Sequence, residues 1–242
     1  MSVWDETTGV ARRTMVLFFL IDKSGSMVGN KIGAVNDAIV NVLPMVKEIA
    51  DNNADAEIKV AVLEFSSGVN WLYDEPKLLD DFIWQDVQAS GLTSLGEACM
   101  ALESKLHQHA GFMSSGSGSF APVVILLSDG EPTDDFEGGL RKLKGNSWFK
   151  HAIKLAIAIG NDASQEKLAD FTGTSEAVFT VHNIEQLRQM IRLAVITSSM
   201  VGSTSTRTGD SGKQKTVLED MKKQLPEQET LPGQEAEKDE WD

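Results

Sequence analysis

The chain has 242 residues, of which 41% are hydrophobic, and it carries a formal net charge of −14 with an isoelectric point near 4.7. These values predict one large α/β domain, or one domain with an appendage, and a sizeable core. The negative charge and the lack of a basic stripe argue against a face that binds nucleic acid or an anionic membrane. Cys99 is the only cysteine, which excludes an intrachain disulfide and favours a reducing compartment.

The start of the chain is polar, and we expect it to be a short lead-in. Arg12-Arg13 followed by the apolar run Met15 to Ile21 superficially resembles the start of a signal peptide, but the run stops at Asp22 without a small-residue cleavage site. No other window approaches the roughly 18 apolar residues of a membrane span. We therefore expect a soluble, cytoplasmic protein.

A strand and a long helix open the predicted domain. Met15 to Ile21 predicts a buried strand, and from Lys31 apolar residues recur at spacings of three and four, which predicts a helix with one buried stripe. That stripe contains Ile32, Val35, Ile39, Val42, Val46 and Ile49. Pro44 should kink the helix, because it cannot donate to the carbonyl of Val40.

The next segments predict a strand, a turn and an edge strand. Glu57 to Phe65 alternates and is rich in Val and Ile, and after the turn Ser66-Ser67-Gly68 the segment Val69 to Tyr73 predicts an antiparallel edge strand. Leu78 to Trp84 predicts a short helix.

A second helix and a loop follow. Ser94 with Glu97 has the form of a capping box and should begin a helix that reaches Leu106. Gly111 to Ser119 is rich in Gly and Ser and predicts a mobile loop.

The second half of the domain continues the alternation of strands and helices. Pro122 to Leu127 predicts a central strand, and Asp134 with Glu137 predicts a helix start. Further segments predict a strand at 152–159, a short helix at 164–171, a last strand at 177–181 and a final helix, capped by Asn183 and Gln186, to about 198.

This alternation predicts a doubly wound, mostly parallel six-stranded sheet with one antiparallel edge strand and helices on both faces. We expect a lead-in at 1–13, the domain at 14–200 and an acidic, largely disordered tail at 201–242, because the tail has few apolar residues. Within the tail, a capping box and a terminating proline predict a short helix at 216–225.

The tail leaves three interpretations open. The segment 216–225 and Trp241 suit a docking segment that folds on a partner. Alternatively, the tail only keeps the protein soluble, or its acidic residues reach the metal of a neighbouring molecule.

The stretch Asp22-Lys23-Ser24-Gly25-Ser26 follows the first predicted strand. In an extended segment, Asp22, Ser24 and Ser26 present three oxygens on one side, while Gly25 lets the backbone turn. A carboxylate with two hydroxyls suits Mg²⁺ or Mn²⁺ better than Zn²⁺. The alternative is a polar turn in which Ser26 and Asn30 cap the helix.

Two more oxygen-bearing loops should reach the same edge of the sheet, one containing Thr93 and one containing Asp129. The predicted site is therefore Asp22, Ser24, Ser26, Thr93 and Asp129. Thr93 as a helix cap and Asp129 as a turn residue are the alternatives. Convergence of all five residues favours the site.

These five residues resemble the von Willebrand factor A (VWA) domain, whose metal-ion-dependent adhesion site (MIDAS) has the pattern Asp-x-Ser-x-Ser, a distant Thr and a distant Asp. The resemblance covers the chain from about Arg13 to Ser198. Within the family, three segments look like the bacterial TerY-like VWA proteins of tellurite-resistance and chemical-stress clusters. They are Ser128-Asp129-Gly130-Glu131-Pro132-Thr133-Asp134-Asp135, Thr93-Ser94-Leu95-Gly96 and Ala156-Ile157-Ala158-Ile159-Gly160.

The resemblance implies that Ser24, Ser26 and Thr93 contact the metal, while Asp22 and Asp129 act through bound waters. Neutral hydroxyls leave the cation under-neutralised, so an open coordination position should attract a carboxylate from a partner protein. The resemblance thus implies a metal-dependent interaction module or scaffold in a stress response, with kinase- or phosphatase-type proteins among its partners. Lys23 is a variable position in the motif, and we expect it to be solvated.

An enzyme is the alternative class, because Asp22 after a buried strand also resembles the nucleophile of haloacid-dehalogenase-type phosphotransferases. Those enzymes carry an acid/base aspartate two residues later, where this chain has Ser24. The sequence contains no P-loop, dinucleotide-binding or zinc-protease motif. We therefore expect a binding protein and no enzymatic activity.

Overall fold

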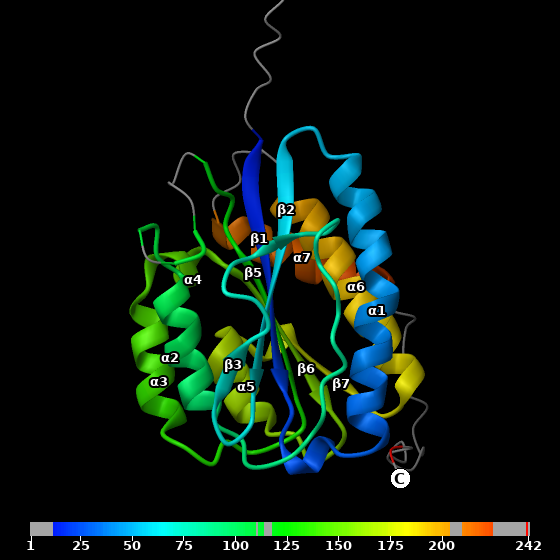
Figure 1. The fold of residues 1–242 in the computed structure, drawn as a ribbon, viewed down its shortest axis with the longest axis vertical. Helices are drawn as coiled ribbons and strands as arrows, with labels where there is room; N and C mark the ends of the chain where they lie inside the picture. The colour runs from blue at the N-terminus through cyan, green and yellow to red at the C-terminus, as the bar shows by residue number, and fades with distance from the viewer. Residues whose placement is uncertain (1–11, 110, 114–117, 204–209, 225–240, 242) are drawn as a thin grey trace, which may run out of the picture.

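A seven-stranded sheet forms the centre of the fold in this computed structural model, which describes residues 12–109, 111–113, 118–203, 210–224 and 241 (Figure 1). The strand order is β3-β2-β1-β5-β6-β7, and β4 pairs with β2 beside β3. The parallel strands are β1 (Arg13–Asp22), β2 (Ala56–Phe65), β5 (Val123–Ser128), β6 (Ile153–Ile159) and β7 (Val178–Val181). The short strands β3 (Val69–Trp71) and β4 (Lys77–Leu78) are antiparallel to β2.

Strand β1 is the centre of this sheet and divides its core into two layers. Leu17, Phe19 and Ile21 face one hydrophobic cluster, and Phe18 and Leu20 face the other. All five side chains are fully buried, as expected for a parallel strand covered on both faces. The chain turns in opposite directions on the two sides of β1, because β2 lies on one side and β5 on the other.

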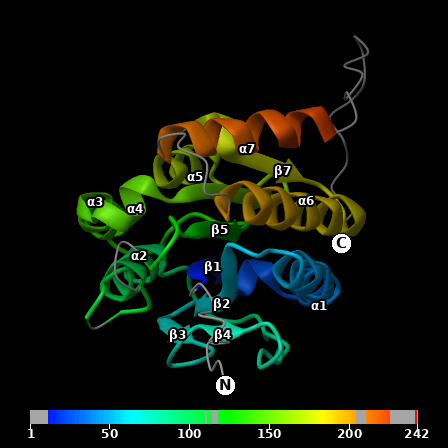
Figure 2. The ribbon, with the colours of Figure 1, turned by 90° about the horizontal axis from the view of Figure 1, so that it is seen from above.

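Helices cover both faces of the sheet. Figure 2 shows α1 and α6 on one face and α2 and α3 on the other. The α-helices are α1 (Asn30–Asp51), α2 (Leu95–Lys105), α3 (Phe136–Gly145), α4 (Ser147–His151), α5 (Gln165–Thr172), α6 (Ile184–Gly202) and α7 (Asp210–Gln224), with short 3₁₀ turns η1 (Gly25–Met27) and η2 (Ser175–Ala177). Among the described helices, none is long and apolar enough to cross a membrane.

The predicted mostly parallel α/β sheet is confirmed, with one addition and one correction at its edge. The expected edge strand is β3, and the two-residue β4 adds a second antiparallel segment. The predicted helix at Leu78–Trp84 is wrong. Instead Lys77–Leu78 pairs with β2, a turn follows in which the N–H of Asp81 donates to the carbonyl of Leu78 at 3.0 Å, and the hydroxyl of Tyr73 donates to the carbonyl of Ile83 at 2.8 Å.

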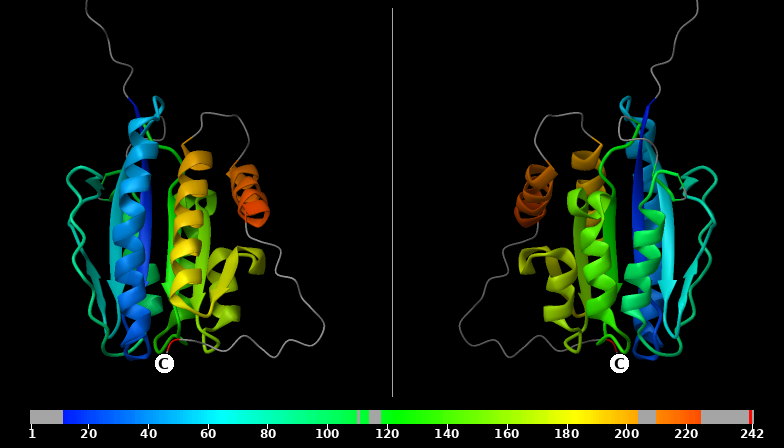
Figure 3. Two further views of the ribbon diagram at one scale, coloured as in Figure 1. Left: turned by 90° about the vertical axis from the view of Figure 1, so that its right-hand side faces the viewer. Right: turned by 90° about the vertical axis from the view of Figure 1, so that its left-hand side faces the viewer.

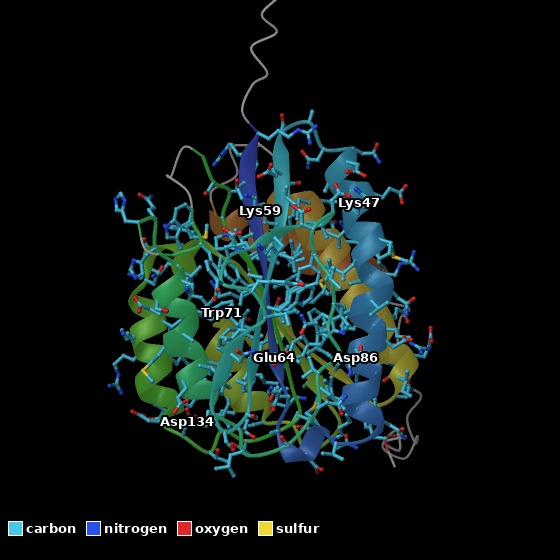
Figure 4. The ribbon with its side chains drawn as sticks, in the orientation of Figure 1. Lys47, Lys59, Glu64, Trp71, Asp86 and Asp134 are labelled. Atoms are coloured by element: carbon cyan, nitrogen blue, oxygen red, sulfur yellow. The ribbon has the colours of Figure 1, made fainter. Side chains whose placement is uncertain are left out.

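Two predicted helix caps are also corrected. Ser94 precedes α2 but makes no side-chain cap bond. Instead the carboxylate of Asp134 accepts from the backbone N–H groups of Gly96 and Glu97, at 2.9 and 2.8 Å. Asp135, the next residue, caps α3 by accepting from Gly138 at 3.0 Å. Figure 4 labels Asp134 near the first turn of α2. This side chain therefore connects the loop after β5 to the start of α2.

The tail contains more helix than its composition predicts. Helix α7 begins six residues before the expected 216 and packs outside α6 (Figure 3). Its residues Val217, Leu218 and Met221 are buried in the same cluster as α1 and α6. The side chain of Gln214 accepts from the backbone N–H of Lys154 and donates to its carbonyl. These bonds satisfy the backbone at the start of β6, because β7 pairs with β6 only from Ala156 onward.

The expectation of a largely disordered tail therefore does not hold for 210–224. The other predicted disordered stretches, 204–209, 225–240 and the centre of the loop at 111–119, lie outside the described residues.

The packing of α7 predicts a measurable contribution to stability. Met221 is fully buried, so Met221→Ala should lower the free energy of unfolding by about 2–4 kcal/mol, because it removes apolar contacts and leaves a cavity. Chemical denaturation measures the difference. The matched control is Lys215→Ala on the exposed face of α7, which should change stability by less than about 0.5 kcal/mol. Equal effects of the two changes would contradict a packed α7.

Candidate functional site

The five residues singled out in the sequence lie together at the carboxyl edge of the sheet. Asp22 ends β1, Ser24 and Ser26 lie in or beside η1, and Asp129 follows β5 directly. Thr93 reaches this edge because its loop is hydrogen-bonded on both sides. The N–H of Gly25 donates to Gly91 at 2.9 Å on one side, and the N–H of Thr133 donates to Thr93 at 2.9 Å on the other.

A chain of hydroxyl contacts connects the site. The Oγ atoms of Ser24 and Ser26 lie 3.0 Å apart, and Ser26 Oγ donates to Asp129 Oδ1 at 2.7 Å. A Cβ placed on Gly130 would lie 3.5 Å from both Ser26 Oγ and Thr93 Oγ1, so these two hydroxyls approach the same point. Glycine at 130 thus leaves free the position between these two hydroxyls that a Cβ would occupy.

Asp22 is the buried anchor of the site. Its Oδ1 accepts from the N–H of Ser24 at 2.8 Å and its Oδ2 accepts from Ser128 Oγ at 2.6 Å. Burial raises the pKa of Asp22, hydrogen bonds from Ser128 and Ser24 offset part of the increase, and the charge of Asp129 adds to it. A fully buried carboxylate with both oxygens engaged is poorly placed to attack a substrate, which disfavours the phosphotransferase alternative.

Two lysines at this edge are ion-paired. Lys31 Nζ donates to Asp129 Oδ2 at 2.7 Å, and Lys23 Nζ donates to Glu64 Oε2 at 2.9 Å. The expectation that Lys23 is solvated is therefore wrong, because the side chain of Glu64 on β2 lies within its reach. Figure 4 labels Glu64 in the half of β2 that ends at this edge.

Lys31 and Ser128 also contact the predicted site residues, although neither belongs to the five residues predicted from the sequence. Ser128 is adjacent to Asp129, so its position at the end of a strand was an available signal. Lys31 was not identifiable in this way, because its contact with Asp129 crosses from α1 to β5 and depends on how the helix packs.

The alternative in which this stretch only caps a helix is not supported by the geometry. Gly29, with φ of 90°, occupies the N-cap of α1, and no side chain caps that helix. The side chains of Ser26 and Asn30 bond elsewhere, to Asp129 and to Trp241 respectively.

The donor set fits a hard divalent cation. Ser24, Thr93 and Asp129 are buried, while Ser26 is exposed, so the group of oxygens opens to solvent on one side. Within the described part of the chain, no group of three or more His, Cys, Asp or Glu residues could hold a metal ion. Hydroxyl and carboxylate oxygens suit Mg²⁺ and Mn²⁺, which prefer oxygen ligands. Cys99 lies elsewhere in the core, where burial raises the pKa of its thiol and keeps it inert.

Comparison with known proteins agrees with this geometry. The family model of the von Willebrand factor type A domain matches residues 17–193. No curated protein sequence matches the chain.

Several solved structures share the fold. One is proximal thread matrix protein 1 from the mussel byssus with a zinc-occupied MIDAS motif (18% identity, 76% of this chain and 48% of that chain, TM-score 0.57). Others are the ArnB paralog VWA2 from Sulfolobus acidocaldarius (18%, 76% and 45%, 0.54) and the pilus adhesin SpaC from Lactobacillus rhamnosus GG in an open conformation (14%, 76% and 30%, 0.60). The chain spans less than half the length of each. Identities this low establish the common fold alone.

The raised pKa of Asp22 predicts how stability depends on pH in the presence of a chelator. The folded domain holds this proton more tightly than the unfolded chain, so the associated stability is complete below the unfolded pKa of 3.8 and is lost as pH rises through the folded pKa. Asp22→Asn removes the buried charge and keeps an acceptor for Ser24. At pH 7 in chelator it should melt at a higher temperature than wild type.

The control for this prediction is the pH profile. Near pH 3 the wild-type carboxyl is protonated, so the difference in melting temperature should shrink. A variant that matches wild type near pH 3 but melts below it at pH 7 would mean that the charged form of Asp22 is favoured in the fold.

Proposed function

Since the chain belongs to the von Willebrand factor type A domain family, we propose that its five oxygen-bearing residues hold Mg²⁺ or Mn²⁺ and that this cation binds a carboxylate of a partner protein. The observation that carries the proposal is the contact chain from Ser24 through Ser26 to Asp129, with Thr93 approaching the same point. This chain opens to solvent at Ser26, where a partner has access.

Each residue has a distinct role in this proposal. Ser24, Ser26 and Thr93 supply neutral oxygens to the cation. Asp22 and Asp129 supply negative charge, Asp22 holds the backbone N–H of Ser24, and Asp129 orients the hydroxyl of Ser26. When bound, the cation supplies a Lewis-acidic position that a carboxylate oxygen can occupy. Neutral ligands leave part of its charge uncompensated, which favours an anionic ligand from outside.

Exposed apolar residues beside the site favour a protein partner. Val28 after η1 is 62% exposed and Leu92 before Thr93 is 59% exposed, and their loops are joined by the bond from Gly25 to Gly91. A partner that inserts a carboxylate between them would bury both side chains, at about 25 cal/mol per Å² of apolar surface. The domain is therefore proposed as an interaction module, without an enzymatic role.

The cellular role rests on the sequence resemblance to TerY-like proteins. On that basis we place the interaction domain at residues 14–200, with α7 packed against it, in a cytoplasmic scaffold of the tellurite or chemical-stress response. Its partners would be kinase- or phosphatase-type proteins that present an Asp or Glu. What supports this assignment is the likeness of the loops around Thr93 and Asp129, together with the acidic charge, which disfavours nucleic-acid and membrane partners.

The metal site predicts a thermal shift. A ligand that binds only the folded state adds RT ln(1 + [L]/Kd), about 2.7 kcal/mol at 100 Kd, so Mg²⁺ or Mn²⁺ should raise the melting temperature of wild type. Asp129→Asn should abolish this increment, because it removes charge and weakens the acceptor of Ser26.

The matched control is Glu131→Gln, an exposed acidic residue two positions later in the same loop. It should respond to Mg²⁺ as wild type does. If Asp129→Asn responds as fully as Glu131→Gln, the site assignment is wrong.

The partner contact predicts capture that depends on the cation. In pull-downs at physiological salt, a partner should be retained with Mg²⁺ and released by chelator, and Asp22→Ala should lose it by the same factor as chelation. Substitution of the captured partner's contacting carboxylate should cost about tenfold or more in affinity, because a charge-assisted contact is worth about 1.5–3 kcal/mol. Equal capture with and without chelator would contradict the proposal.

A further inference from the structure

Trp241 is buried beside the site although it lies far along the chain. Its side chain is 7% exposed and belongs to the core cluster that includes α1 and α6. Asn30, the first residue of α1, donates from Nδ2 to the carbonyl of Trp241 at 3.2 Å. Both backbone and side chain of Trp241 are thus in contact with the folded domain.

One lysine connects this contact to the proposed cation site. A Cβ placed on Gly160 would lie 3.4 Å from Lys31 Nζ and 3.6 Å from Trp241 Cδ1, so lysine and indole both lie over this glycine. The same Nζ donates to Asp129 Oδ2 at 2.7 Å. Trp241 is therefore separated from the carboxylate of Asp129 by a single side chain.

Gly160 makes the seat possible. It follows β6 and has φ of 89°, a conformation that side-chain-bearing residues rarely adopt, and it leaves the space against which the indole packs. We call the surface formed by Asn30, Lys31 and Gly160 the tryptophan seat. It lies at the carboxyl edge of the sheet, where β1 and β6 end and α1 begins (Figure 1).

The fit of Trp241 in this seat is incomplete. Its indole Nε1 is buried without a hydrogen-bond partner among the described residues, which costs about 1–3 kcal/mol. An occupant held by apolar contact and one backbone bond, with an unsatisfied donor, can be displaced by a ligand that satisfies its polar groups.

The sequence around Trp241 has the chemistry expected of a ligand for this edge. Glu240 and Asp242 flank it, and Glu235, Glu237 and Asp239 precede it closely. A large aromatic side chain among carboxylates suits a surface that combines an apolar seat, Lys31 and a divalent cation.

We propose that the tryptophan seat is a docking surface whose resident occupant is the C-terminal end of this same chain, anchored by Trp241. Where the proposed function holds, this end competes with a partner's carboxylate for the edge that contains Ser26 and Asp129, and a partner must displace it.

The test uses full-length protein and a fluorescein-labelled peptide of residues 231–242, with binding followed by anisotropy in chelator and in Mg²⁺. Trp241→Ala protein has an open seat and should bind the peptide saturably. Wild type should bind it about tenfold more weakly, because its own end is present at an effective concentration on the order of millimolar. A peptide with Trp241→Ala should not bind.

Matched variants on α1 localise the seat. Asn30→Ala, combined with Trp241→Ala, removes the donor to the peptide carbonyl and should weaken binding several-fold. Asn41→Ala in the same background is the control, because among the described residues the Asn41 side chain bonds only to Asp37 within α1, and its loss should leave binding unchanged.

Three outcomes would overturn the proposal. Equal peptide affinity for wild type and Trp241→Ala would mean that the seat is open in wild type, and no binding to Trp241→Ala would mean that it is no docking surface. A wild-type dimer that Trp241→Ala dissociates, measured by light scattering, would make a second copy the occupant. The peptide assay in chelator tests the tryptophan seat without the cation. The proposed function is tested separately, by whether Asp129→Asn loses the thermal shift with Mg²⁺, so failure of one proposal can be told from failure of the other.

Discussion

The parallel pairing of β1 with both β2 and β5 is the constraint on which the site depends. In register, Asp22 lies opposite Phe65 of β2, and Ile21 lies opposite Leu127 of β5. Both neighbouring strands therefore end close to the level of Asp22. The loops that leave these strands must therefore start at the same place. The connections diverge on the two sides of β1, and this edge is the one at which open α/β sheets bind ligands.

The same pairing accounts for the burial of Asp22. Strand β1 is covered on both faces by helices, so a carboxylate at its end lies at the border of the core. Ser128 on the neighbouring strand and the N–H of Ser24 donate to it, and these bonds offset part of the cost of desolvation. A buried charge of this kind reduces the stability of the fold, and such charges are typical of functional sites, where a nearby positive charge can offset the cost of desolvation.

The edge of the sheet also gathers groups that do not belong to the site motif. Lys31 on α1 pairs with Asp129, Asp134 connects the loop after β5 to α2, and Trp241 packs over Gly160. The hydrogen bond from Asn30 to Trp241 also joins segments here, across 211 residues of sequence. The side chain of Lys31 thus lies between the hydroxyl cluster and the tryptophan seat.

The sequence by itself determined the alternation of strands and helices, and it singled out the five residues of the candidate site and the edge at which they lie, because local periodicity and strand-end motifs depend on neighbouring residues only. Tertiary structure decided what depends on long-range contacts. Lys77 and Leu78 form a strand because β2 offers them a partner, and α2 takes its cap from Asp134 because the loop after β5 lies against it. Helix α7 packs against α6 and β6, which bury Val217 and Met221. The stabilisation from this packing cannot be predicted from the helix sequence alone, because a short isolated helix is only marginally stable. Lys31 and Trp241 joined the site for the same reason: only the packing of α1 against the ends of the strands brings them within reach of it.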